Sequence, residues 1–549
     1  MSVIIYEKAL RDCDKFVDQF IRNQQSDPNK SYYGNSDNSD TMGEVGAVVY
    51  GGSITIYLSA YFNEKSKHYK NQNLLSRMIL AFDFMDEYQR PDGTFDLPIC
   101  NYYSSPDTAF LVNGLLDAYN LVQIYADDEV IKKQLSERLK KVMMKGAEAL
   151  KKCGFHTPNH RWVVSAALTR MYNVTGDSTY MDTAHKYFAE GIDCNEYGEY
   201  TERSAGMYNY INDKAMMYIG EALKDPQYFE YMKRNLKMMF SYIEDDISIF
   251  TMNSTRQDYG TTVYAFKYYP LYLYMAERMQ DGQFYTMVKK MEEKIFKMNY
   301  NICDQLYFLM LYPKLIDFQM EPQPLPVTEN NFYEDSGVVR MKQNNLSVTL
   351  LKDNADVLHI RNGGMNFFLR IGFGFFNDRY FIAKEIVQSE GGYTLTYDHL
   401  ATYYLPFENP PASSNWNEMD RESRDQYHPC HLFMDLNVKL IEDGVKIHVT
   451  SKGCDNIPVR FELNFSEGGF FETDYAMGKA TSSTSFVFKK GYLTVDNGKE
   501  SLIAGPAFAE HRAIEPFRDS LPESDKHFTA YFTAYSDLDN EFTIIKGRS

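Results

Sequence analysis

The stretch DFQMEPQPLPVTENN, residues 317–331, separates two parts of the chain that differ in their hydrophobic periodicity. It places three prolines within five residues and has no apolar period, which is typical of a linker. Before it, apolar residues recur at intervals of three and four, as amphipathic helices require. After it come short alternating or β-branched runs that predict strands. The sequence therefore predicts a helical domain of residues 1–315, a linker of residues 316–331 and a β-domain of residues 332–549.

The helical part consists of amphipathic segments joined by short turns. Helices are predicted over residues 74–89, 108–126, 130–152, 162–172, 178–190, 208–223, 226–242, 262–279 and 284–298. Turn chemistry separates several of them, at residues 91–93, 175–177, 224–226 and 281–282. About a dozen helices connected in this way form successive antiparallel hairpins, which assemble into a solenoid or a toroid. Helix number alone does not fix whether such an array closes.

Longer connections alternate with these short turns, at residues 98–106, 153–161, 193–206 and 251–261. If hairpins stack side by side, every second connection lies at the same end, so the long connections are expected to open on one rim. Loops on a rigid scaffold commonly carry function. The unusual polar residues lie in or beside these connections: Asn101, Asp107, Asn159, His160, Arg161, Glu202, Arg203, Arg256 and Asp258.

The β part contains about a dozen short strand patterns with no helical pattern between them, which predicts a large antiparallel sandwich. Gly, Asn and Asp turns separate several strands, for example at residues 443–444 and 497–498. The expected fold class is therefore a multidomain α and β protein. A toroid or barrel of (α/α) hairpins, incomplete in its closure, precedes an antiparallel β-sandwich.

The composition of the chain limits the classes of partner that it can bind. The net charge of −18 argues against nucleic acid, which needs a basic face, and an anionic ligand needs a local cluster of Arg or Lys. No window is long and apolar enough for a membrane span, so no membrane partner is expected. The N-terminus lacks the features of a signal peptide, which favours a cytoplasmic location, or a periplasmic or secreted one if a leader was removed. The 44 Tyr can line wet clefts, including carbohydrate-binding grooves.

Cysteine usage gives no support for a metal ribbon or a disulfide framework, because the 7 Cys include no CxxC pair. Cys430 and His431, near His428, form the densest group of possible metal ligands. We interpret them as ordinary residues of a surface loop. No cofactor is expected, although a structural or assisting divalent metal is left open, as is the oligomeric state.

Four segments resemble the heparinase II/III-like polysaccharide lyases, which combine an (α/α) toroid with a β-sandwich. The segments are TPNHRWVV (157–164), YTERSAGMY (200–208), NFYEDSGVVR (331–340) and VLHIRNGG (357–364). The first is similar to the Asn-His/Trp stretch ahead of a toroid helix in those enzymes, and the second to the segment that carries their catalytic Tyr. The third is similar to the strand that opens their β-domain, and the fourth lies where they have a His between early β-strands. The likeness in layout covers nearly the whole chain, but each motif is short.

The chain departs from this family at one segment. The usual H-G-H-x-D-like zinc and substrate segment is absent, and only His359 remains of it, so structural zinc is in doubt. The short loops and the segment TRQDYG, residues 255–260, are similar to a divergent branch such as the rhamnose–glucuronate lyases, which act on plant gums. The resemblance implies an anionic oligosaccharide or polysaccharide as the substrate.

A uronate lyase removes a weakly acidic proton next to a carboxylate and expels the glycosidic oxygen. The site must neutralise the carboxylate at the developing enolate and must supply a base and an acid. His160 or Asn159 would hold the carboxylate. Tyr208 would act as base, acid or both, and His359 as a second acid–base group. The predicted catalytic residues are thus His160, Tyr208 and His359. The predicted substrate-binding residues are Asn101, Asp107, Asn159, Arg161, Glu202, Arg203, Arg256 and Arg361.

Structural interpretations compete with these roles. His160 precedes a helix and fits a neighbour of its N-terminal cap. Tyr208 is one of 44 Tyr. Glu202 with Arg203 fits a solvated ion pair of small energetic worth. His359 fits a packed histidine in a strand, and Asp258 with Arg256 fits a clamp of a turn.

Two other functions also fit the sequence. One is a glycoside hydrolase that uses two carboxylates about 5 to 10 Å apart, for which Asp107, Glu202 and Asp258 are available. The other is a non-catalytic protein that binds glycans.

Overall fold

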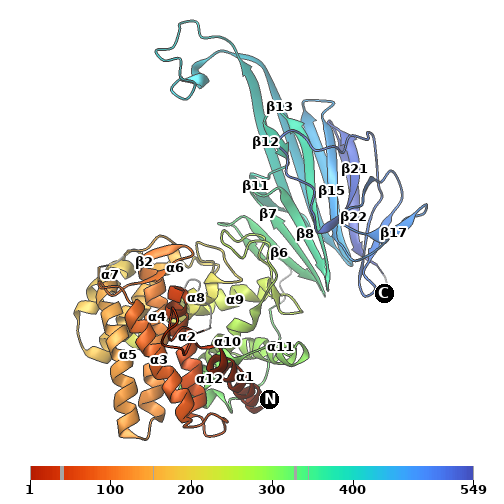
Figure 1. Ribbon diagram of the computed structural model, residues 1–549. Coiled ribbons are helices and arrows are strands. Elements are labelled where there is room, and N and C mark those ends of the chain that lie inside the picture. The colour runs from red at the N-terminus through yellow and green to blue at the C-terminus, as the bar shows by residue number, and fades with distance from the viewer. Residues whose placement is uncertain (1, 37–42, 153, 327–330, 344, 548–549) are drawn as a thin grey trace. The chain divides into compact units, whose positions relative to one another are not determined.

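The computed structural model describes residues 2–36, 43–152, 154–326, 331–343 and 345–547. The chain forms two compact units, Met1–Pro326 and Val327–Ser549. Their boundary lies inside the stretch 316–331. The first unit is helical and the second is built of sheets (Figure 1).

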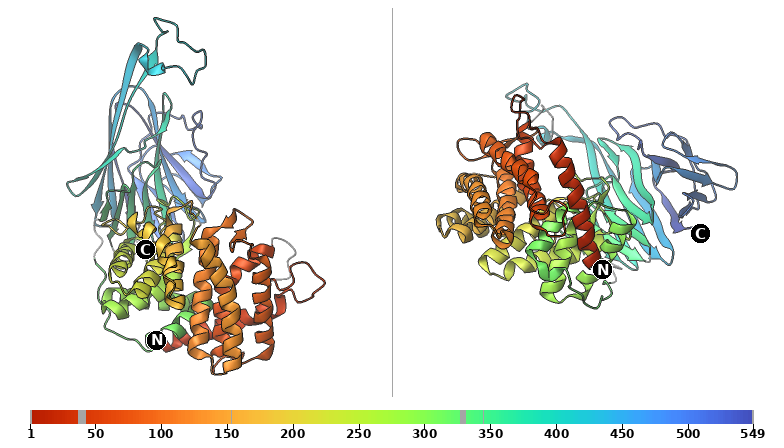
Figure 2. Two further views of the ribbon diagram at one scale, coloured as in Figure 1. Left: turned by 90° about the vertical axis from the view of Figure 1, so that its left-hand side faces the viewer. Right: turned by 60° about the horizontal axis from the view of Figure 1, so that its bottom comes forward.

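The first unit is an array of helical hairpins (Figure 2). Its helices are α1 (Ser2–Asn23), α2 (Gly43–Phe62), α3 (Gln72–Tyr88), α4 (Ser105–Tyr125), α5 (Glu129–Leu150), α6 (Pro158–Thr175), α7 (Thr179–Ala189), α8 (Tyr208–Leu223), α9 (Gln227–Tyr242), α10 (Tyr269–Met279), α11 (Gly282–Lys297) and α12 (Leu306–Leu311). Helices α2, α4, α6 and α8 pack against one another in succession, and α3, α5, α7 and α9 pack behind them. The even-numbered helices therefore form an inner layer and the odd-numbered helices an outer layer.

The two ends of the array meet. Helix α12 packs against α2 and α4. Lys8 Nζ donates to Asn299 Oδ1 at 3.3 Å, and the backbone N–H of Ile302 donates to Asp12 Oδ2 at 3.2 Å. Contacts between the first and last hairpins thus give the unit a toroidal arrangement, a point that the sequence left open.

The long connections all precede even-numbered helices, as predicted. Those before α4, α8 and α10 contain the small strand pairs and loops of this rim: β1 (Phe95–Leu97) with β2 (Asn101–Ser104), residues 190–207, and β3 (Ser248–Ile249) with β4 (Val263–Tyr264). Short turns, such as residues 126–128 and 176–178, join the helices at the other end. Because successive hairpins repeat the same up-and-down path, the inner helices all begin at the rim that carries the long loops.

Two glycines allow α2 and α4 to approach closely. A Cβ added at Gly114 would lie 1.6 Å from the carbonyl oxygen of Gly51, and one added at Gly51 would lie 2.5 Å from the Cα of Leu111. No side chain fits between backbones at this distance. The pair Gly51 and Gly114 therefore sets the spacing of these two inner helices.

The second unit contains two nine-stranded sheets. The first has the order β18-β21-β15-β9-β8-β7-β6-β5, with β10 on β9, and the second has the order β11-β12-β13-β14-β22-β20-β19-β16-β17. The strands are β5 (Asn331–Tyr333), β6 (Val338–Gln343), β7 (Leu346–Leu351), β8 (Asp356–Asn362), β9 (Met365–Phe375), β10 (Asp378–Tyr380), β11 (Glu385–Ser389), β12 (Gly392–Tyr404), β13 (Gln426–Ile441), β14 (Gly444–Gly453), β15 (Pro458–Ser466), β16 (Gly469–Glu472), β17 (Met477–Ala480), β18 (Ser485–Val487), β19 (Leu493–Asp496), β20 (Ser501–Gly505), β21 (His527–Tyr535) and β22 (Asp539–Lys546). Pairing is antiparallel except between β18 and β21, which run parallel.

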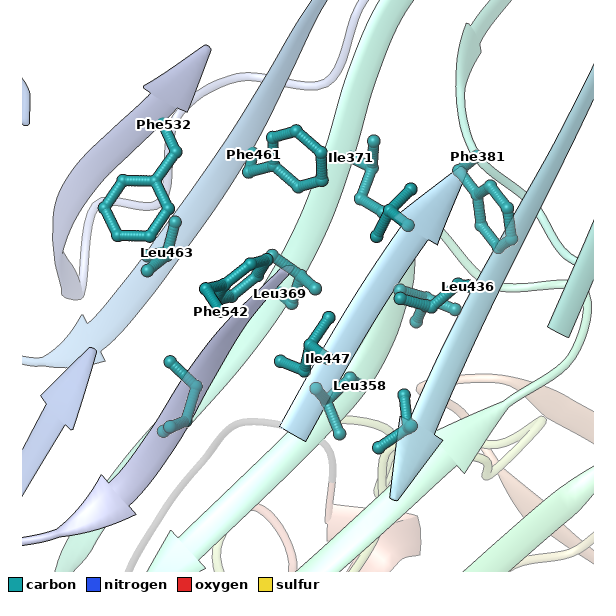
Figure 3. Packing of buried hydrophobic residues seen from close by; sticks show 14 of the residues in the cluster. Leu358, Leu369, Ile371, Phe381, Leu436, Ile447, Phe461, Leu463, Phe532 and Phe542 are labelled. Atoms are coloured by element: carbon teal, nitrogen blue, oxygen red, sulfur yellow. The ribbon is translucent and has the colours of Figure 1, made fainter. Parts of the chain in front are cut away.

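One apolar core joins the two sheets of the second unit (Figure 3). Leu369 and Phe461 point into it from the first sheet, and Leu436 and Ile447 from the second, all fully buried. Alternate residues of each strand face this core, as two sheets packed face to face require. The predicted β-sandwich is confirmed.

Candidate active site

Asp258 holds two long loops of the rim together. It is 1% exposed and accepts hydrogen bonds from Ser204 Oγ at 2.8 Å, the Gly206 backbone N–H at 2.9 Å and Ser254 Oγ at 2.5 Å. Asp258 is therefore a loop clamp, as one of the sequence interpretations proposed, although its partners are these groups and not Arg256. The clamp fixes residues 193–207 beside residues 251–261.

A series of buried polar side chains connects the start of α6 with the clamped loops. Asn159, in the first turn of α6, donates from Nδ2 to Glu202 Oε2 at 2.7 Å, and Arg256 Nε lies 3.4 Å from Glu202 Oε1. Asn159 is fully buried and Glu202 almost so. Burial raises the pKa of the Glu202 carboxyl, and the hydrogen bond from Asn159 and the charge of Arg256 partly oppose this shift. Glu202 thus orients both an amide and a cation.

His160 lies beside these polar side chains and carries a neutral imidazole. Burial lowers its pKa to about 4, and the neighbouring His156 and Arg256 contribute to the shift. The rings of His156 and His160 meet edge to face, with their centroids 4.8 Å apart. The Nδ1 atom of His160 is buried and has no hydrogen-bond partner among the described residues. A neutral imidazole in this position can accept a proton when an anion approaches, because a nearby negative charge favours its protonated form.

Tyr208 begins α8 and keeps its phenol partly open to solvent. The hydroxyl donates to Gln257 Oε1 at 3.2 Å, and the guanidinium carbon of Arg256 lies 4.9 Å from the centre of the ring. Its backbone N–H donates to Ser204 Oγ at 3.1 Å, so the clamped loop also positions the helix start. A cation over the ring stabilises negative charge that develops on the phenol oxygen.

The structure thus brings together five of the predicted residues: Asn159, His160, Glu202, Tyr208 and Arg256. They come from the first turns of α6 and α8 and from the two clamped loops. The Glu202 carboxylate forms an ion pair with Arg256. Arg203 adopts a positive φ of 50° in a turn where its N–H donates to Tyr200 O at 2.8 Å.

Three other predicted residues serve the scaffold in this structure. Asn101 Nδ2 donates to Asp107 Oδ2 at 2.8 Å, and Asp107 accepts from the N-cap residue Ser104 at 2.5 Å, so this pair forms the start of α4. Arg161 pairs with Glu190 at 3.0 Å and with Asp193 at 3.6 Å. Successive residues of a helix point in different directions, so Arg161 cannot share the direction of His160.

His359 and Arg361 belong to the second unit. His359 lies in β8 opposite Thr349 and Phe368, and burial lowers its pKa to about 4. Arg361 Nε donates to Gly363 O at 2.9 Å. A site that His359 shares with residues of the first unit stays a prediction.

Sequence reasoning missed Gln257 and a cavity inside the helical unit. The cavity has a volume of about 490 Å³ and is lined by α2, α4, α6, α8 and α12 together with the short helices η1 (Ala265–Tyr268) and η2 (Cys303–Gln305). Tyr210, Lys214 and Tyr218 line it from α8 at four-residue intervals. A tyrosine–lysine stripe on one face of a predicted inner helix was the signal that could have revealed it.

In the described part of the chain, no three His, Cys, Asp or Glu side chains are placed to share a metal ion. His431 Nε2 lies 2.5 Å from Asp398 Oδ1, and Cys430 Sγ lies 3.4 Å from the carbonyl oxygen of His428. None of the helices in the described residues has the length and apolar character needed to cross a bilayer.

Comparison with solved structures relates this architecture to known proteins, although no family model and no curated protein sequence matches the chain. The chondroitin AC lyase of Streptomyces coelicolor A3 superposes with a TM-score of 0.57 and 9% identity, over 98% of this chain and 79% of that one. The heparan sulfate lyase HepC of Pedobacter heparinus gives 0.53 and 9%, over 98% and 83%. The Paenibacillus xanthan lyase gives 0.61 and 9%, and this chain spans 57% of its length.

The chain has the heparinase-like polysaccharide lyase fold. The likeness spans both the hairpin toroid and the sandwich, because nearly the whole chain is covered in each comparison. At about 9% identity it establishes the polysaccharide lyase fold and not the chemistry, since function resides in sites built on a fold.

Proposed function

We propose that the protein is a polysaccharide or oligosaccharide lyase that cleaves a glycosidic bond to a uronic acid by β-elimination. The observation that carries the proposal is the gathering of His160, Tyr208 and Arg256 at the rim where the inner helices begin. The structural neighbours named above include lyases of chondroitin and heparan sulfate, which supports an anionic glycan as substrate.

Each residue has a role in this mechanism. Arg256 and His160 face the substrate carboxylate and neutralise it as the enolate develops. Tyr208 takes the proton from the carbon next to the carboxylate. The electron pair forms the new double bond, the glycosidic C–O bond breaks, and the leaving oxygen takes that proton back from Tyr208, so the residue ends the cycle in its starting state. Asn159 acts indirectly, because its amide holds Glu202, which in turn holds Arg256.

The contacts of the candidate carboxylates support elimination over hydrolysis. A glycoside hydrolase requires two carboxylates that flank the sugar. Asp258 is occupied by three hydrogen bonds within the loop clamp, and Asp107 is occupied by Asn101 and Ser104 at the start of α4. Only Glu202 of the three candidates remains beside His160 and Tyr208, and it is already paired with Arg256.

The test is a panel of uronate-containing glycans, followed by ultraviolet absorbance of the unsaturated uronate and by mass spectrometry of the products. Elimination yields an unsaturated end without uptake of water. Hydrolysis adds the mass of water and gives no absorbance. Hydrolytic products, or binding without turnover across the panel, would refute the lyase proposal in favour of a hydrolase or a non-catalytic glycan-binding protein.

A further inference from the structure

The cavity inside the toroid begins one helical turn from the candidate active site. Val163 lines it on α6 and follows Asn159 by one turn, and Ile211 lines it on α8 and follows Tyr208 by one turn. At about 490 Å³ the cavity lies within the range of pockets that bind small ligands, roughly 300–1,000 Å³. A sugar chain that reaches His160 and Tyr208 from the rim therefore has room for further atoms along the axis of the toroid.

A network of buried charges closes the far end of the cavity. Arg170 Nη2 and the Tyr218 hydroxyl each donate to Asp117 at 2.5 Å, and Lys214 Nζ donates to the Tyr307 hydroxyl at 2.7 Å. These five residues come from α4, α6, α8 and α12, so they join four inner helices across the interior. The network therefore obstructs the interior of the toroid at this level.

The charges that remain available favour a single negative charge on the ligand. Arg170 is hydrogen-bonded to Asp117, and Lys214 Nζ lies 3.9 Å from the second oxygen of the same carboxylate. Lys267 and Asp304 also line the cavity. The three cations Arg170, Lys214 and Lys267 against the carboxylates of Asp117 and Asp304 leave an excess of one positive charge. The inner helices also begin at this rim, and the positive ends of their dipoles favour an anion.

The remaining walls suit a sugar. Tyr210, Tyr218 and Tyr307 line the cavity, and aromatic rings of this kind can pack against the apolar faces of pyranoses. Gly52 also lines the cavity, and a Cβ added there would meet no atom within 4 Å. The wall at Gly52 is therefore open space and not packed core.

We propose that this cavity binds a terminal carboxylate-bearing sugar and that its closed end makes the enzyme act on chain ends. This inference rests on the proposed lyase function for the cleavage itself. The binding of the sugar does not depend on cleavage. A purely structural network would tie the helices together in the same way, but it would leave the cavity indifferent to uronates.

The binding test uses D-glucuronate as the probe and D-glucose as the neutral comparison, measured by calorimetry on the full chain. We expect glucuronate to bind more tightly than glucose. Lys214→Gln and Lys267→Gln should each weaken glucuronate binding roughly tenfold or more, because each removes a charged donor. Lys186→Gln, on the outer helix α7 and exposed, is the matched control and should bind as the wild type does.

Because Lys214→Gln also breaks the hydrogen bond to Tyr307, a second variant is needed to distinguish loss of binding from loss of folding. Gly52→Phe fills the cavity from an open wall, and Gly52→Ala shows whether any side chain at this position harms the fold. We expect Gly52→Phe to abolish glucuronate binding with an unchanged melting temperature. Equal binding of glucuronate and glucose, or glucuronate binding that survives Gly52→Phe, would overturn the cavity proposal.

The product distribution tests the chain-end action separately. On a long uronate-containing glycan, early products should be short fragments of one size with little fall in viscosity. A broad ladder of unsaturated oligosaccharides would overturn chain-end action while leaving the lyase function intact. Conversely, glucuronate binding that depends on Lys214 without any unsaturated product would sustain the cavity and refute the lyase.

Discussion

Asn159 donates a hydrogen bond of 2.7 Å to the Glu202 carboxylate, and both side chains are buried, with exposures of 0% and 3%. The second oxygen of Glu202 faces Arg256 Nε at 3.4 Å. Through this carboxylate, the first turn of α6 sets the position of a cation on a different loop. The candidate site therefore depends on a buried pair that does not itself need to touch substrate.

Replacing Glu202 should test this dependence. Glu202→Ala leaves a buried amide and a guanidinium without their acceptor, which we expect to lower the free energy of unfolding by roughly 1–3 kcal/mol. Glu202→Gln keeps an acceptor oxygen and should cost less. Urea unfolding followed by tryptophan fluorescence gives the measurement, because the first unit contains the fully buried Trp162 and the other tryptophan, Trp416, is 58% exposed. Glu196→Gln, an exposed residue of the same loop, is the control. Equal stability of all variants would contradict the role assigned to Glu202.

Tyr208→Phe should leave the fold intact, because the phenol makes its hydrogen bond to Gln257 at an exposed position. If Tyr208 moves the proton, turnover should fall by roughly 10²–10⁴-fold. Initial rates on a glycan that gives unsaturated product provide the measurement. Tyr259→Phe removes a hydroxyl from an exposed tyrosine of the neighbouring loop and should keep nearly full activity. Near-normal activity of Tyr208→Phe would remove this residue from the mechanism.

Stability should decrease below neutral pH because of His160. Its pKa in the folded protein is about 4, below the ordinary value of 6.5, so above 6.5 both folded and unfolded states hold a neutral ring. As the pH falls from 6.5 towards 4, the unfolded state takes up a proton that the folded state does not. The free energy of unfolding then falls, by up to about 3 kcal/mol for this group.

Urea unfolding at pH 7 and pH 5, followed by Trp162 fluorescence, measures this loss. His160→Gln should flatten the difference between the two pH values, whereas His185→Gln, at an exposed position of α7 in the same unit, controls for the loss of a histidine elsewhere. An unchanged pH dependence in His160→Gln would show that other groups cause the decrease.

Gly114→Ala should destabilise the toroid through the close approach of α2 and α4. The added Cβ would lie 1.6 Å from Gly51 O, so the two helices must move apart. Overpacking of this kind typically costs about 1–3 kcal/mol. Gly52→Ala provides the comparison, because its Cβ meets open space and alanine favours a helix over glycine. Thermal unfolding should therefore show a lower melting temperature for Gly114→Ala only.

Much of the fold was predictable because periodicity is local. The pattern over residues 208–223 gives α8 with the observed bounds, and the alternating runs give most strands of the sandwich. Helix α2 was missed because it is apolar on all sides and contains Gly46, Gly51 and Gly52, so it has no polar face to mark its period. The short α12 was also missed, since six residues give too few turns for a pattern.

The site was predictable only in part, because sequence does not show which way a side chain points. His160 and Arg161 are adjacent and both suit an anionic sugar, yet Arg161 pairs with Glu190 and Asp193. Asp107 and Asp258 suited a hydrolase. However, Asp107 forms hydrogen bonds at the start of α4, and Asp258 forms hydrogen bonds that hold two loops together. The partners that decide these roles lie on other elements, and nothing local in the sequence specifies them.

The meeting of the first and last hairpins has a consequence for how this protein folds. In an open row of hairpins each repeat touches only its neighbours, so folding can start anywhere and spread. Here the bond from Ile302 to Asp12 joins residues 290 positions apart. Such a contact forms only after nearly the whole helical unit has been synthesised, and contacts between distant residues slow folding. On the ribosome, the helical unit would therefore remain an unclosed row of hairpins until its last helix emerged.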